Sequence, residues 1–150
     1  MIKFKRDFTD EENLMLGEAL NYIVKRLNHL LKHPEYAYLH FNAVTDAQKN
    51  KVIECLHKMT FVSCGIYKCA TKWHPISWFG YGLCCPFKPG KGILIAEKTF
   101  KEGVNSLIEI IIHEFSHSSL GTIDGLYAKG IDSDKFEDRI KDAWVWTFII

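Results

Sequence analysis

The sequence predicts an α+β fold with N-terminal helices, a small sheet and a C-terminal helix. Three observations support this prediction. Apolar residues recur at helical spacing from Leu16 to Leu31. Runs rich in β-forming residues occupy 60–70 and 92–100. The stretch SLIEIIIHEFSHSSLGTIDGLYA, residues 106–128, then begins as an apolar helix and carries two histidines, a carboxylate, a glycine and a second carboxylate.

The composition places the chain among soluble globular proteins, with 47% hydrophobic and 25% charged residues in a length of 150. We expect one domain over residues 1–150, because this length suffices to bury a core. The net charge of +1, without a basic cluster, argues against a nucleic-acid partner and against a polybasic membrane patch. No run approaches the roughly 18 apolar residues of a membrane span.

The cysteines and the first residues predict where the chain is made. The opening MIKFKRDFTDEEN has no apolar core of the kind found in signal peptides. The odd count of five cysteines is typical of a chain made in a reducing compartment, so we expect synthesis in the cytoplasm and free thiols. A cysteine zinc site is disfavoured, because adjacent Cys84 and Cys85 reach one tetrahedral ion together only with difficulty.

Three pairs of residues match the capping box that opens a helix: Thr9 with Glu12, Thr45 with Gln48, and Ser106 with Glu109. The first pair predicts a long amphipathic helix that ends before Pro34. The second predicts a shorter helix to about Met59, and the third opens the helix of the histidines.

Residues 60–70 and 92–100 are expected as strands, and residues 71–90 as a loop or irregular hairpin broken by Gly and Pro. The loop is crowded with aromatic residues, which either pin it to the surface or line a substrate cleft: Trp73, Trp78, Phe79, Tyr81 and Phe87. A last helix is expected from about Asp134. Its predicted apolar face consists of Phe136, Ile140, Ala143, Trp144, Thr147 and Phe148.

The motif His-Glu-x-x-His predicts a metal site on the third helix. His113 and His117 lie one turn apart, so both imidazoles can reach a single cation from one helical face. Glu114 lies beside them, over the open position of the metal, as the general base of zinc hydrolases does. The alternative is two ordinary histidines on a packing helix.

A hydrolytic zinc ion needs a third protein ligand, and the chain must turn to supply it. Gly121 suits the left-handed position that ends a helix and reverses the chain. Asp124 follows this turn and is the favoured third ligand. The competing candidates are Glu137 and Asp138, farther along the chain.

HEFSH followed by GTIDGLYA resembles the signature of the aspzincins, the deuterolysin and lysine-specific metalloendopeptidase family. The resemblance implies a zincin-like metallopeptidase with a sheet edge strand beside the active-site helix and one zinc ion per chain. It assigns His113, His117 and Asp124 as zinc ligands, Glu114 as catalytic base, and Tyr127 as the group that stabilises the oxyanion. The short spacing before the glycine is closer to effector proteases of bacterial pathogens, which predicts an effector or toxin delivered by a non-classical or dedicated route.

The predicted function is that of a zinc metalloendopeptidase, a hydrolase acting on a protein or peptide substrate as a monomer. An inactive zincin-like binding module and a helical protein with a chance motif are the alternatives. By analogy with zincins, the strand Ile93, Leu94 and Ile95 is expected to pair with an extended substrate. The resemblance also suggests cleavage before lysine, for which Asp142 and Asp138 are candidate partners. The favoured alternative is that both face solvent, so no residue preference is predicted.

Overall fold

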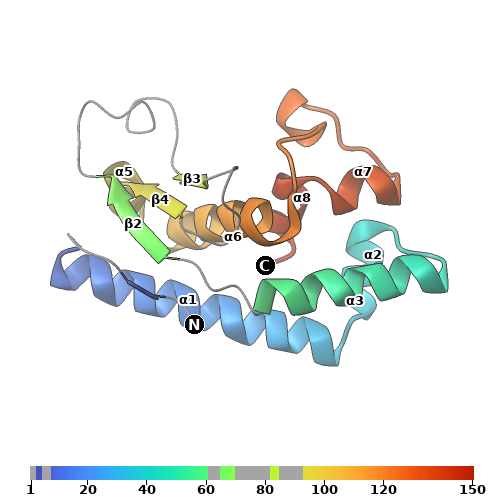
Figure 1. Cartoon of the computed structure of the whole chain (residues 1–150), viewed down its shortest axis with the longest axis horizontal. Coiled ribbons are helices and arrows are strands. Elements are labelled where there is room, and N and C mark those ends of the chain that lie inside the picture. The colour runs from blue at the N-terminus through green and yellow to red at the C-terminus, as the bar shows by residue number, and fades with distance from the viewer. Residues whose placement is uncertain (1–2, 5–7, 61–64, 70–81, 85–92) are drawn as a thin grey trace.

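The computed structural model describes residues 3–4, 8–60, 65–69, 82–84 and 93–150. Within them the fold is mostly helical, with a small sheet at one end (Figure 1). The aromatic residues predicted either to pin the loop or to line a cleft lie outside the described residues: Trp73, Trp78, Phe79, Tyr81 and Phe87.

The first helix, α1, spans Asp10–Lys32 and begins with the predicted capping box. The hydroxyl of Thr9 accepts a hydrogen bond from the N–H of Glu12, and the Glu12 carboxylate accepts one from the N–H of Thr9. The helix buries its apolar stripe of Leu16, Leu20, Ile23, Leu27 and Leu30. Because each such side chain contributes about 1.5–3 kcal/mol when it leaves water, this stripe anchors α1 on the core.

Two shorter helices follow. The helix α2, Glu35–Phe41, was not expected, because Pro34 suggested a break; instead Pro34 is the residue that starts the new helix. The helix α3, Asp46–Thr60, confirms the second capping box, with Thr45 and Gln48 bonded reciprocally. In α3, Cys55 is a buried free thiol, and burial raises the pKa of that thiol.

The sheet has the order β1-β2-β4-β3. The strands are β1 at Lys3–Phe4, β2 at Gly65–Cys69, β3 at Gly82–Cys84 and β4 at Ile93–Ala96. The strand β4 runs parallel to β2 on one side and antiparallel to β3 on the other. The expectation that Ile93, Leu94 and Ile95 pair with a substrate is therefore wrong, because both edges of β4 are already paired. The edge strands are β1 and β3, and β3 is the one that contacts α6.

The predicted strand 92–100 ends early, because α5 occupies Glu97–Glu102. This turn of helix buries Phe100, whose ring packs on Phe8 with 5.6 Å between centroids. The helix α6, Val104–Leu120, starts directly afterwards at the N-cap Gly103. The predicted capping box of Ser106 and Glu109 is wrong, since Ser106 lies inside α6 and donates to the Glu102 carboxylate instead.

The predicted last helix is divided in two. A 3-10 turn, η1, at Tyr127–Lys129 precedes α7 at Phe136–Ile140, and α8 follows at Ala143–Phe148. The division falls at Asp142, whose extended backbone and side chain cap α8. The predicted apolar face is buried in part only, because Phe148 is 47% exposed.

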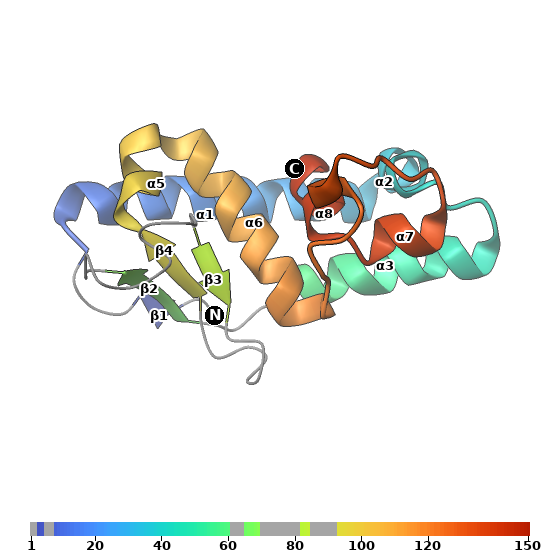
Figure 2. The ribbon, with the colours of Figure 1, turned by 90° about the horizontal axis from the view of Figure 1, so that it is seen from above.

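The helix α6 is the central element of the fold (Figure 2). It contacts α1, α3, α5 and α8, and it also touches β3 and β4. Leu107, Ile111, Ile112 and Phe115 are almost fully buried along it. A helix packed on so many sides is a rigid support for ligands. Among the described residues, no helix is long and apolar enough to cross a membrane.

Candidate metal centre

The two histidines of the motif lie one turn apart on α6. Their Nε2 atoms are 3.2 Å apart. The side chain of His113 is 5% exposed and that of His117 is 14% exposed. The apolar run that precedes them buries α6 and so holds the two histidines in place.

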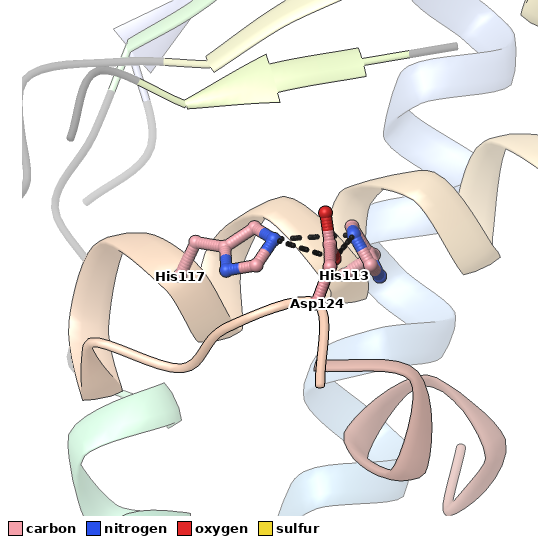
Figure 3. Close-up of side chains that lie close together, drawn as sticks. All are labelled: His113, His117 and Asp124. Atoms are coloured by element: carbon pink, nitrogen blue, oxygen red, sulfur yellow. Dashed lines mark hydrogen bonds and ion pairs between the residues drawn. The ribbon is translucent and has the colours of Figure 1, made fainter. Parts of the chain in front are cut away.

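Gly121 ends α6 in the left-handed conformation, as predicted, with φ 66° and ψ 29°. Its N–H bonds to the carbonyl of His117 and the chain reverses there. The reversal brings Asp124 over the histidines, with Oδ1 at 2.9 Å from Nε2 of His113 and 3.2 Å from Nε2 of His117. Figure 3 shows the three side chains pointing toward one another, two from α6 and one from the loop.

This donor set fits zinc. Two imidazoles and one carboxylate are a known ligand set of catalytic zinc, with bonds of about 2.0–2.2 Å. Ligand atoms at such distances lie roughly 3.3 Å apart around a tetrahedral ion, close to the separations observed. Among the residues that the structure describes, His113, His117 and Asp124 are the group that can hold a metal ion. The Asp124 side chain is 56% exposed, so the site opens to solvent.

Both imidazoles have a partner on the nitrogen that faces away from the site. Nδ1 of His117 lies 2.7 Å from the carbonyl oxygen of Thr122, which can only accept, so this nitrogen donates. Nδ1 of His113 lies 3.5 Å from Oγ1 of Thr147, whose own hydrogen goes to the carbonyl of Ala143. These contacts leave each Nε2 with a lone pair for a metal ion.

The Thr122 side chain is itself held, because its hydroxyl lies 2.8 Å from that of Ser116. Sequence reasoning missed Thr122, Ser116 and Thr147 as supports of the ligands. The sequence could have indicated Ser116 and Thr122, since Ser116 is a polar residue next to the predicted ligand His117 and Thr122 is a polar residue next to the turn at Gly121. Thr147 gave none, because its place beside His113 depends on the packing of α8 against α6.

Burial of His113 keeps its imidazole neutral. Loss of hydration lowers the pKa of His113 from its ordinary 6.5 to about 4, against the opposing attraction of Asp124. The ring also lies against Trp144, with 4.2 Å between centroids. A neutral imidazole at pH 7 can coordinate a cation without first releasing a proton.

Glu114 and Tyr127 are the two residues predicted to take part in catalysis. Glu114 is buried on α6, directly after the first histidine. Tyr127 begins η1, three positions beyond Asp124 along the chain, and is 39% exposed. Its ring lies 5.2 Å from that of Phe148. The roles of base and oxyanion donor remain predictions for these two residues.

The structure separates the competing acidic residues. Glu137 is exposed on α7 and is not part of the metal-binding group of described residues. Asp138 accepts the hydroxyl of Ser133. Asp142 is only 3% exposed, and its oxygens accept the N–H groups of Trp144 and Tyr127. The expectation that Asp142 faces solvent is therefore wrong, and its predicted pairing with a substrate lysine gains no support.

A groove of about 580 Å³ lies between α1, α6 and α8. Its lining includes Tyr22 and Glu18 of α1, Ile108 of α6, and Thr147 and Phe148 of α8. Of these lining residues, Thr147 also lies 3.5 Å from Nδ1 of His113 through its Oγ1, and the ring of Phe148 packs on that of Tyr127. Sequence reasoning did not find this groove, because its walls come from three helices far apart in the chain.

No protein-family model and no curated protein matches the sequence. Among solved structures, the chain is similar to a zinc peptidase from Grifola frondosa. The TM-score is 0.72 at 15% sequence identity, with 95% of each chain covered. The fold is therefore that of a zinc peptidase. The resemblance predicted from the motif is confirmed, since His113, His117 and Asp124 group as the HExxH-plus-Asp pattern requires.

Proposed function

We propose that this protein is a zinc-dependent endopeptidase. The observation that carries the proposal is the meeting of His113, His117 and Asp124 at 2.9–3.2 Å on the central helix of a zinc-peptidase fold. These three residues would hold one zinc ion, and the exposed side of Asp124 leaves room for water and substrate.

When bound, zinc supplies a Lewis acid that lowers the pKa of a coordinated water toward 7. Glu114, adjacent to the first ligand, takes the proton of the attacking water and passes it to the leaving amine. The Tyr127 hydroxyl donates to the oxyanion of the tetrahedral intermediate, a contact commonly worth about 3 kcal/mol in the transition state.

Peptide recognition is proposed on the strand β3 and on the groove between α1, α6 and α8. The strand β3, at the sheet edge, contacts α6 and can accept an extended peptide by main-chain pairing. The groove beside Thr147 and Phe148 has a size typical of ligand sites and can hold substrate side chains. Main-chain pairing accounts for peptide bonds as the substrate without fixing a residue preference.

The test is hydrolysis of a mixed peptide library by the zinc-loaded protein. We expect cleavage that a chelator abolishes and that added zinc restores. Glu114→Gln is the matched control, because it removes the base while keeping the shape of the side chain; we expect it to retain zinc and to lose cleavage. If the wild type binds zinc but cleaves no peptide, the protein is not a peptidase and the alternative of an inactive binding module is supported. Loss of zinc in a folded Glu114→Gln variant would overturn the role of Glu114 as base.

A further inference from the structure

A single buried carboxylate joins the loop of the third ligand to the last helix. Oδ1 of Asp142 lies 2.9 Å from the backbone nitrogen of Trp144, at the start of α8. Oδ2 of the same side chain lies 3.1 Å from the backbone nitrogen of Tyr127. The two oxygens thus bind two segments that are separate in sequence.

The backbone around Asp142 holds the same loop at a second place. The N–H of Ile123 donates to the carbonyl of Lys141 at 2.9 Å, and the N–H of Ala143 donates to the carbonyl of Ile123 at 3.0 Å. Asp124 follows Ile123 directly. The predicted ligand is therefore held on one side by this bridge, and the loop is held on the other side, at Tyr127, by the carboxylate.

Burial strengthens this arrangement. Asp142 is 3% exposed, and hydrogen bonds from N–H groups to a buried carboxylate are among the stronger ones. Gly125 allows the loop to come this close, because a Cβ at that position would lie 3.1 Å from Oδ2. The loop thus passes close to the carboxylate at Gly125 and is hydrogen-bonded to it at Tyr127.

The other end of the connection reaches the first histidine. Asp142 caps α8, and α8 carries Trp144, whose ring lies 4.2 Å from that of His113. The same helix carries Thr147, the partner of Nδ1 of His113. One carboxylate therefore fixes the start of a helix that orients His113 and the loop that presents Asp124.

We propose that Asp142 is a positioning residue of the metal centre, which holds the loop 123–127 and α8 in register so that Asp124 and His113 meet one ion. Its effect on the metal does not depend on peptide hydrolysis. Its effect on Tyr127 in catalysis rests on the proposed function. The role differs from that of a partner for a substrate lysine, because Asp142 acts on the chain itself.

The test replaces Asp142 by Asn, which keeps an oxygen for the N–H of Trp144 and presents an amide group to Tyr127. We expect zinc affinity to fall about 10- to 100-fold, the usual effect of removing a partner that orients ligands. Hydrogen exchange at the Tyr127 amide should become faster in the metal-free protein. Thr9→Ala is the matched control, because it removes a helix cap remote from the site and should lower Tm without changing zinc affinity.

Gly125→Ala perturbs the same contact from the loop side and keeps the proposal testable if Asp142→Asn does not fold. We expect weaker zinc binding from it as well, and less than additive losses when the two changes are combined. Zinc affinity and Tyr127 exchange equal to wild type in a folded Asp142→Asn variant would overturn the proposal. A wild type that binds zinc but cleaves no peptide would reject the peptidase and leave this inference standing.

Discussion

Oδ1 of Asp124 lies 2.9 Å from Nε2 of His113, although the two residues belong to different elements. His113 is fixed by the buried helix α6, whereas Asp124 arrives on the loop that reverses at Gly121. A rigid helix would supply two ligands to a zinc ion and a short turn would supply the third. The Asp124 side chain is 56% exposed, so solvent reaches the site, as a catalytic zinc site requires.

Tyr127→Phe removes one hydroxyl and little volume. We expect kcat to fall about 100-fold with KM nearly unchanged, because an oxyanion donor acts in the transition state alone. Zinc content should stay at the wild-type level. Tyr36→Phe, an exposed tyrosine on α2, is the matched control and should leave kcat unaltered. A Tyr127→Phe variant with full kcat would remove Tyr127 from the mechanism.

Phe148→Ala tests the groove between α1, α6 and α8. Phe148 is 47% exposed, so its loss should change binding more than folding. We expect KM for a peptide to rise roughly tenfold, in line with the loss of about 1–2 kcal/mol of apolar contact. Leu39→Ala on α2, which is 77% exposed, is the control for the loss of a surface apolar group. Equal KM values for the three proteins would exclude the groove as part of the substrate site.

The metal-free protein should lose stability in acid because of His113. Its pKa is lowered by burial from 6.5 to about 4, so the unfolded chain takes up the proton first as the pH falls. The contribution of His113 to the free energy of unfolding is therefore complete above pH 6.5 and is lost progressively toward pH 4. Urea unfolding between pH 7 and pH 4 measures this slope. His113→Gln should flatten it, and an unchanged slope would contradict the cause assigned here.

Local signals in the sequence predicted local structure well. The capping boxes at Thr9 and Thr45 fixed the starts of α1 and α3, because they depend on residues three positions apart. The left-handed turn at Gly121 and the grouping of Asp124 with the histidines also followed from spacing alone.

Features that depend on distant partners were predicted less well. The position of β4 inside the sheet depends on its pairing with β2 and β3. The residues of β4 alone do not indicate which strands will pair with it. The division of the last helix at Asp142 depends on the loop that this carboxylate binds. Cytoplasmic synthesis and an effector role stay predictions.

The identity of the third ligand is the most direct test of the metal centre. Zinc content and affinity should be measured by titration against a chromogenic chelator for the wild type, Asp124→Ala and Glu137→Ala, two variants with the same change in charge. We expect one zinc ion per wild-type chain, affinity at least about 100-fold weaker for Asp124→Ala, and wild-type affinity for Glu137→Ala. Loss of zinc from Glu137→Ala with tight binding retained by Asp124→Ala would contradict the site described here.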